Sequence, residues 1–171
     1  MRFAALTMRA SVGRGFVRVS GTVGNLWAMQ RTVAAIVTDK GSVVFSVDPD
    51  DTVYHALEVM AEKNVGSVLV MKKGKLVGIV SERDYSRKVI LLDRVSKDTA
   101  VAQIMTTKLI TVEPATTVTD CMEIMTEKRV RHLPVLDDGE LIGVISIGDV
   151  VKAVIADQIE LINQLEHYIT G

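Results

Sequence analysis

Hydrophobic and polar positions follow one pattern that occurs twice along this chain, at a constant spacing of 65 residues. In each copy a β-branched run precedes an apolar stripe of helical period, two short apolar runs joined by a polar turn, and a second helical stretch. Identical residues recur at matching positions: Gly74 as Gly139, Gly78 as Gly143, Ser81 as Ser146 and Asp84 as Asp149. A repeat of fixed period indicates one folding unit used twice.

The first copy predicts a strand at 43–47, followed by an amphipathic helix that begins beside Thr52. Val53, Ala56 and Met60 fall at i, i+3 and i+7, so one helical face is apolar. The second copy repeats this stripe, and Cys121 stands where the first copy has Ala56. We therefore interpret Cys121 as a small core residue and not as a reactive thiol.

Two hairpins follow these helices, one in each copy. Strands are predicted at 67–71 and 76–80 and again at 133–136 and 141–145. Gly74 and Gly139 supply the positive φ that tight turns require. A helix over 82–93 and a longer one through 150–168 complete the copies. The pattern therefore predicts an α/β (α+β) fold with the order β-α-β-β-α in each half.

Composition narrows the classes of function. The 171 residues are 48% hydrophobic, which is enough for a sizeable core, and the net charge is −1. A nearly neutral chain with 4% aromatic residues is unlike proteins that bind nucleic acid through basic surfaces and base stacking. The sequence contains no run of eighteen apolar residues, so it predicts no membrane-spanning helix. The lone cysteine excludes an internal disulfide framework and fits a reducing compartment.

The first 38 residues differ from the rest, because they contain five arginines and neither Asp nor Glu. Such a segment is typical of a mitochondrial presequence, which predicts a mitochondrial protein. A basic disordered tail of a cytoplasmic protein, or a start codon assigned too far upstream, would give the same composition. We expect residues 1–38 to lie outside the fold.

The motif Ser-x-x-Asp opens the last helix of each copy, as Ser81 with Asp84 and as Ser146 with Asp149. Backbone N–H groups, the positive end of the helix dipole and a hydroxyl meet there, which suits a phosphate. The aspartate, one turn further on, suits a ribose diol. The same spacing is a capping box, in which both side chains satisfy the helix's own N–H groups. The repeat alone does not separate ligand binding from capping.

Three polar side chains near the helix that follows Ser81 favour ligand binding, because they are larger than their counterparts in the other copy. They stand where the other copy has a small residue: Arg131 for Gly66, His132 for Ser67 and Arg83 for Gly148. Arginine grips phosphate oxygens through two donors and keeps its charge. Two alternatives stay open, since Arg131 could form a surface ion pair and His132 could be half-buried and hydrogen-bonded to a carbonyl.

The order of elements, the motif Gly-apolar-apolar-Ser-x-x-Asp in both copies, the strand Arg131-His-Leu-Pro-Val and the segment Gln103-Ile-Met-Thr together resemble a CBS domain pair, also called a Bateman module. The resemblance covers roughly residues 39 to 171 and looks most like stand-alone bacterial and plant-organelle proteins. It implies two pseudo-symmetric CBS repeats packed sheet to sheet, at 39–93 and 104–171, with a linker at 94–103 and an extended C-terminal helix.

The resemblance also implies two clefts for adenosine-containing ligands. One would use Lys40, Val43, Phe45, Gly66, Ser146, Gly148 and Asp149. The other would use Ser81, Arg83, Asp84, Met105, Thr106, Ile110, Arg131 and His132. In such modules an entering strand reads adenine, the aspartate holds ribose, and serine, arginine or histidine holds phosphate. We expect the Asp84 side to favour a more highly phosphorylated or dinucleotide ligand, and the Asp149 side to offer more room.

The implied ligand is AMP, ADP, ATP or NAD(H), bound for regulation of a partner protein and not for turnover. We expect no catalytic residue, metal or catalytic cofactor, because no His or Cys pair has metal-ligand spacing and no phosphate-binding glycine loop follows a strand. A ligand-free structural module is the alternative. The apolar stripe through 150–169 predicts a homodimer, unless that helix folds back on its own chain. The organelle relatives imply a thioredoxin-type redox protein as a partner.

Overall fold

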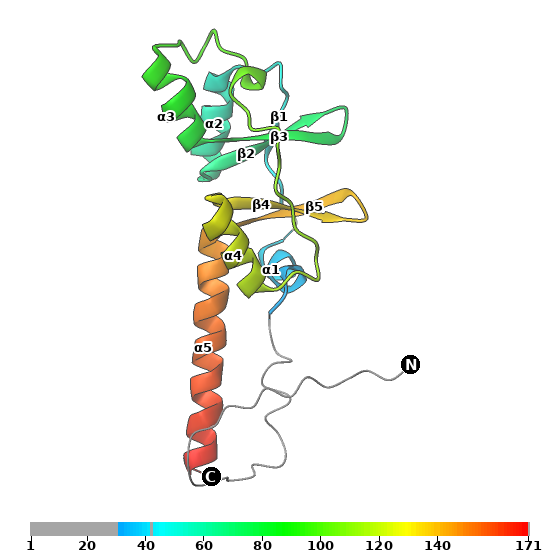
Figure 1. Ribbon diagram of the computed structural model, residues 1–171, viewed down its shortest axis with the longest axis vertical. Coiled ribbons are helices and arrows are strands. Elements are labelled where there is room, and N and C mark those ends of the chain that lie inside the picture. The colour runs from blue at the N-terminus through cyan, green and yellow to red at the C-terminus, as the bar shows by residue number, and fades with distance from the viewer. Residues whose placement is uncertain (1–30, 42, 171) are drawn as a thin grey trace, which may run out of the picture.

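The computed structural model describes residues 31–41 and 43–170 (Figure 1). The helices are α1 (Val33–Lys40), α2 (Val53–Lys63), α3 (Glu82–Lys88), α4 (Val118–Lys128) and α5 (Ile147–Thr170), with 3₁₀ turns at Ile90–Leu92 and Val101–Gln103. The strands are β1 (Ser46–Val47), β2 (Ser67–Lys72), β3 (Lys75–Ser81), β4 (His132–Asp137) and β5 (Glu140–Ser146). The predicted mixed α/β fold is confirmed.

Two small sheets form the centre of the molecule, stacked one above the other in Figure 1. The first has the order β1-β2-β3, with β1 parallel to β2 and β2 antiparallel to β3. The second pairs β4 with β5 in the same antiparallel register. A single parallel bridge between Val112 and Val135 takes the place of the β1–β2 pair Val47–Val70. The two repeats therefore share one topology.

The two hairpins turn as predicted. Gly74 and Gly139 have φ of 77° and 84°, and the residues before them, Lys73 and Asp138, also have positive φ. Two consecutive positive φ values are the signature of the turn that matches the twist of paired strands. Each hairpin then delivers its second strand directly to α3 or α5.

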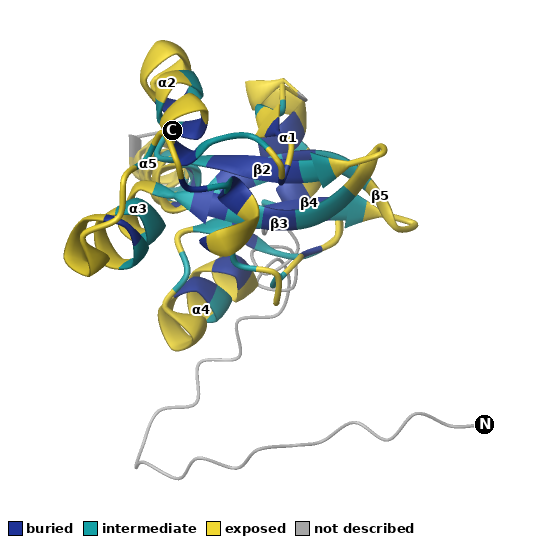
Figure 2. Cartoon of the chain, turned by 90° about the horizontal axis from the view of Figure 1, so that it is seen from above, coloured by how far each residue is buried: buried dark blue, intermediate teal, exposed yellow. Residues whose placement is uncertain are grey.

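Each repeat has its own core, built from the strands and the apolar faces of the helices (Figure 2). Ala56 and Cys121 occupy equivalent buried places on α2 and α4, with no exposed surface. Burial, with a smaller contribution from Asp120, raises the pKa of the Cys121 thiol to about 11. Cys121 is a core residue, as predicted from the stripe.

The prediction that residues 1–38 lie outside the fold is wrong for residues 31–38, which belong to a segment, 31–40, that packs on the second repeat. Helix α1 buries Val33, Ile36 and Val37 in the core of the second repeat. Backbone N–H groups join the segment to the start of α4, since Val33 donates to Thr116 and Val118 donates to Arg31. The apolar residues of α1 thus complete the core of the second repeat, whose other buried residues come from Val112 onward in the sequence. Residues 1–30, which hold most of the presumed presequence, lie outside the described residues.

The segment at 99–105 is the counterpart of α1 and is more than a polar linker. Val101 and Ile104 are almost fully buried in the core of the first repeat. Each segment that leads into a repeat therefore packs on the other repeat, and this exchange holds the two halves together.

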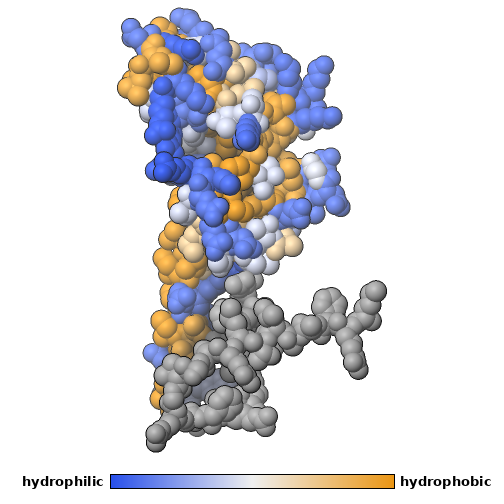
Figure 3. All heavy atoms as spheres, in the orientation of Figure 1, coloured by the Kyte–Doolittle hydropathy of each residue, from blue (hydrophilic) through white to orange (hydrophobic). Residues whose placement is uncertain are grey.

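Two elements are shorter than predicted. The strand expected at 43–47 contributes only Ser46–Val47 to the sheet, and α3 ends at Lys88, ahead of a separate 3₁₀ turn. Helix α5, in contrast, extends well beyond the second repeat, and Figure 3 shows hydrophobic side chains along it. Among the helices of the described residues, none has the length and hydropathy that a membrane span requires.

Candidate functional site: two clefts between the repeats

The first cleft, called the Asp84 cleft below, has a volume of about 600 Å³. One wall is the start of α3 and the other is the segment between α4 and β4. Its lining residues are Gly66, Ile79, Ser81, Glu82, Arg83, Asp84, Arg87, Lys88, Thr106, Arg129, Val130, Arg131 and His132. The second repeat thus supplies the wall opposite the first repeat's Ser-x-x-Asp motif.

The second cleft, called the Asp149 cleft below, is related to the first by the pseudo-symmetry of the repeats but has a volume of about 310 Å³. Its lining residues are Lys40, Val43, Val44, Phe45, Asn64, Val65, Gly66, Ser67, Leu69, His132, Val144, Ser146 and Asp149. Gly66 and His132 line both clefts. The expectation of more room on the Asp149 side is wrong, because a lysine and apolar side chains from the entering segment occupy that space.

Both Ser-x-x-Asp motifs form capping contacts. Asp84 Oδ2 accepts hydrogen bonds from Ser81 N (3.1 Å) and Ser81 Oγ (2.6 Å), while Asp84 N donates to Ser81 Oγ (3.3 Å). Asp149 and Ser146 repeat these contacts at 2.7, 2.7 and 3.3 Å. Capping is therefore present at both helix starts, yet each motif still opens onto a cleft that side chains leave empty. One carboxylate can serve both purposes, since it has several acceptor positions.

The second oxygen of Asp84 faces other partners. Asp84 Oδ1 lies 2.7 Å from Lys88 Nζ, one turn further along α3, and accepts a long hydrogen bond from Thr106 Oγ1 at 3.5 Å. Lys88 also donates to the carbonyl of Ile104. The counter-charge of Asp84 therefore comes from its own helix and is held against the segment that packs on the first core.

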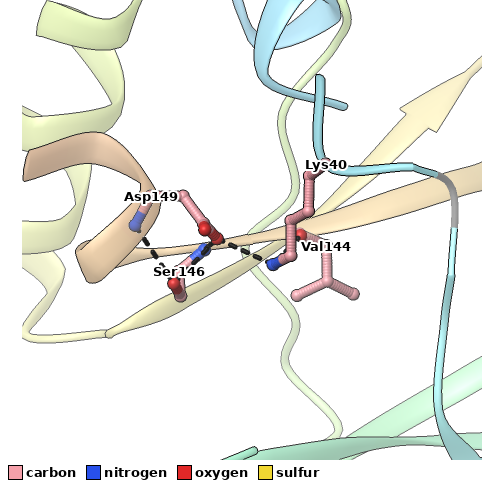
Figure 4. Close-up of polar contacts among 4 residues, drawn as sticks. All are labelled: Lys40, Val144, Ser146 and Asp149. Atoms are coloured by element: carbon pink, nitrogen blue, oxygen red, sulfur yellow. Dashed lines mark hydrogen bonds and ion pairs between the residues drawn. The ribbon is translucent and has the colours of Figure 1, made fainter. Parts of the chain in front are cut away.

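Asp149 obtains its counter-charge from a distant part of the chain (Figure 4). Lys40 Nζ, at the end of α1, lies 2.8 Å from Asp149 Oδ2 and 3.4 Å from the carbonyl oxygen of Val144. Partial burial alone would raise the pKa of Asp149, but hydrogen bonds from Lys40 and Ser146 outweigh it and lower that pKa below its usual value. The contacts with Lys40 and Ser146 therefore favour the ionised form of the carboxylate.

The Asp84 cleft collects arginine side chains from both repeats. Arg83 and Arg87 come from α3, and Arg129 and Arg131 come from the end of α4 and the residues before β4. Arg83 donates to the carbonyl of Arg129 at 3.2 Å. Within the described part of the chain none of the four forms an ion pair, and together with Lys88 they outnumber the two carboxylates of the cleft, Glu82 and Asp84. This excess of positive charge suits a polyanionic ligand.

His132 lies where the two clefts meet, at the start of β4. Burial lowers the pKa of this imidazole, Lys40 and Arg131 lower it further, and Asp149 acts in the opposite direction. A neutral imidazole offers one donor and one acceptor to either cleft. The half-buried histidine expected from the sequence is present, although no hydrogen bond to a carbonyl holds its side chain among the described residues.

The structure brings together most, but not all, of the predicted residues. Met105 packs on the first core and covers Gly78, Ile110 packs on the second core, and Gly148 is exposed on the first turn of α5, so these three line neither cleft. Lys88 and Arg129 line the Asp84 cleft although the sequence did not predict either residue there. The position of Lys88 four residues after Asp84 on one helix was a usable signal. The approach of Arg129 to α3 depends on how the repeats pack and left no trace in the local pattern.

Comparison with known proteins gives consistent matches. The sequence profile of the CBS domain matches residues 29–90 and 101–156. The mitochondrial CBS domain-containing protein CBSX3 of Arabidopsis thaliana is 50% identical over 127 residues, which cover 71% of this chain and 62% of that protein, less than two thirds of its length. A putative signal-transduction protein with CBS domains from Burkholderia ambifaria is 53% identical, with a TM-score of 0.73 over 75% of this chain and 96% of that one.

A more distant solved structure shares the fold alone. The CBS domain pair of the protein MJ0100 is 20% identical, with a TM-score of 0.64 over 72% of this chain and 94% of that chain. That pair was solved in complex with 5′-methylthioadenosine and S-adenosyl-L-methionine.

Proposed function

Since this chain belongs to the CBS domain family, with one CBS unit in each of its repeats, we propose that it is a regulatory module that binds an adenosine nucleotide and thereby modulates a partner protein. The observation that carries the proposal is the Asp84 cleft, which is lined by an aspartate and by four arginines that have no ion pair in the described part of the chain. The ligand class is AMP, ADP, ATP or NAD(H).

In this proposal the phosphates of the ligand lie against the arginines. Arg131 and Arg83 approach the cleft from opposite repeats, so a polyphosphate or dinucleotide can bridge the two halves. Asp84 Oδ1, beside Lys88 and Thr106, accepts the ribose hydroxyls. A domain pair of the same fold holds two adenosine derivatives in its solved complex, which supports the ligand class.

Binding between the repeats provides a route to regulation. A ligand that contacts both walls favours the arrangement of the repeats in which those walls stand at the right separation. The output is then a changed surface for a partner enzyme. A thioredoxin-type redox protein stays a prediction of the family resemblance.

Thermal unfolding with AMP, ATP and NAD at a hundred times their dissociation constants tests the proposal. Such a ligand stabilises the folded state by about 2.7 kcal/mol, which raises the unfolding midpoint of a chain of this size by about 5–10 °C. Inosine nucleotides serve as matched controls for the adenine. A midpoint unchanged by every adenosine ligand, confirmed by calorimetric titration, would rule the function out.

The second component of the proposal is that the protein forms a homodimer. A homodimer is also expected under the alternative function, a structural module without a ligand. Helix α5 carries an exposed apolar stripe: Val151, Ile155, Ile159, Ile162, Leu165 and Ile169. Within the described residues no helix or strand packs on the distal half of α5 (Figure 1). Light scattering should give the mass of a dimer, and Ile162→Glu should shift it toward the monomer. A dimer without nucleotide binding would favour the structural module.

A mitochondrial location is proposed from two observations. The Arabidopsis relative is described as mitochondrial, and residues 1–30 carry four arginines and no acidic residue. Import of the chain into isolated mitochondria, with cleavage upstream of α1, is the expected result. Replacing the four arginines by glutamine should abolish the import.

A further inference from the structure

Lys40 is the only lysine or arginine among the described residues that line the Asp149 cleft, and it already pairs with the aspartate of that cleft. The Asp84 cleft is different, because its aspartate pairs with Lys88 while the arginines stay available. In the segment that enters the second repeat, the position that matches Lys40 is Met105, which lines neither cleft. An ion pair that joins the aspartate of the cleft to the segment entering a repeat, as Lys40 forms with Asp149, therefore has no equivalent in the first cleft.

We propose that Lys40 is the specificity-determining residue of the Asp149 cleft: it leaves Asp149 only for a ligand that carries an anionic group, and it binds that group. The inference rests on the proposed binding of adenosine ligands and assigns the ligand chemistry of the smaller cleft. A ribose diol takes the place of the ammonium group at Asp149, and the phosphate takes the place of the carboxylate at Lys40.

The charge balance of the cleft explains the selectivity. A neutral nucleoside that takes Asp149 leaves the ammonium group of Lys40 without its carboxylate, in a cleft where Asp149 is the only acidic residue among the lining residues that the structure describes. A nucleoside monophosphate gives Lys40 a phosphate in place of the carboxylate and gives Asp149 the ribose hydroxyls, so neither charged group is left without a hydrogen-bond partner. The volume of about 310 Å³ suits one small nucleotide and not a dinucleotide.

The position of Lys40 adds a mechanical consequence. Lys40 is the last residue of α1, and α1 is also tied to α5 at its other end, where Arg31 Nε lies 3.0 Å from Asp157 Oδ1. Val43 and Phe45 follow Lys40 and line the same cleft. Release of Lys40 from Asp149 therefore changes the restraint on the segment that leads into the first repeat, while Val33 stays anchored in the second core.

Calorimetric titration with adenosine and AMP tests the inference in an Asp84→Asn background, which weakens the other cleft. AMP should bind more tightly than adenosine, and Lys40→Met should reduce the ratio of the two affinities about tenfold, because AMP loses a charged contact and adenosine no longer competes with the ammonium. Lys75→Met removes an exposed lysine of the first hairpin and should leave the ratio unchanged.

Two results would count against the inference in different ways. Binding of both ligands with the same affinity ratio in Lys40→Met overturns the role of Lys40 and leaves the proposed function standing. No binding of either ligand to the unsubstituted chain overturns the proposed function, and the inference with it. Melting curves of the variants show that each one is folded during the titration.

Discussion

The two clefts have the same backbone plan and differ in charge, because the Asp84 cleft has an excess of cationic side chains and the Asp149 cleft has one lysine paired with one aspartate. In both, a serine caps a helix together with an aspartate three residues later, at nearly identical distances. The Asp84 cleft adds four arginines that form no ion pair with any residue the structure describes and has about 600 Å³, whereas the Asp149 cleft adds one paired lysine and has about 310 Å³. Similar motifs thus provide two different binding environments.

The difference teaches that the repeated motif is the scaffold and that residues outside the motif set the charge and volume of each cleft. Ser81 and Ser146 each accept a hydrogen bond from the backbone N–H of the aspartate three residues later. Arg131 and Lys40 come from segments that pack against the motif from elsewhere in the chain. A duplicated unit can therefore keep its fold while the two clefts diverge in ligand.

The largest expected effect concerns Arg131. Arg131→Ala should weaken ATP binding about tenfold to a hundredfold, because a charged hydrogen bond to phosphate is lost, and should leave adenosine binding nearly unchanged. Calorimetric titration measures both affinities. Arg94→Ala, which removes an exposed arginine after the 3₁₀ turn, is the control. If the two variants bind ATP equally well, the Asp84 cleft is not the phosphate site.

Cys121 distinguishes the two cores. Cys121→Ala makes the second core like the first, which has Ala56 at this place, and should cost about 1 kcal/mol of the free energy of unfolding. Cys121→Ser puts a hydroxyl into a fully buried apolar site and should cost about 1–3 kcal/mol. Urea unfolding measures both values. A serine variant more stable than the alanine variant would contradict the apolar character of the site.

The aspartates test capping against ligand binding. Asp84→Ala and Asp149→Ala should each cost about 1 kcal/mol of stability through the lost capping contacts. Asp120 is a matched control, because it forms the same capping box with Thr117 at the start of α4 and lines neither cleft. Asp120→Ala should lower stability equally and leave nucleotide affinity intact. If all three variants bind nucleotide with the same affinity, the Ser-x-x-Asp motif serves only as a helix cap.

The smallest expected effect is a pH dependence that belongs to His132. Because burial, Lys40 and Arg131 lower its pKa, the unfolded chain takes up a proton at higher pH than the folded protein does. The free energy of unfolding should therefore fall as pH drops below about 6.5. His132→Ser, which introduces the Ser67 type of the first repeat, should flatten that decline.

Unfolding in urea at pH 7.5, 6.5 and 5.5 measures this effect. His55→Ser, which removes an exposed histidine from α2, serves as the control. A decline that is equally steep in the His132 variant would show that another group causes it.

The sequence predicted the features that arise within a few residues of each other. Helical stripes placed Ala56 and Cys121 in the cores, and glycine placed the turns at Gly74 and Gly139, because local backbone preferences and side-chain period decide both. The spacing also indicated both capping boxes. The prediction failed for α1, whose apolar residues at 33, 36 and 37 were grouped with the basic N-terminus although their spacing was helical.

By itself, then, the sequence determined the duplicated fold, the two equivalent helix starts and their serine–aspartate pairs, since a repeated local pattern folds in the same way twice. Only the tertiary structure decided that α1 packs on the second repeat and that Lys40 meets Asp149, 109 positions away along the chain. It likewise decided that Arg129 approaches α3, where its carbonyl accepts a hydrogen bond from Arg83. These contacts depend on how two finished repeats are placed against each other, which the period of a hydrophobic pattern does not encode.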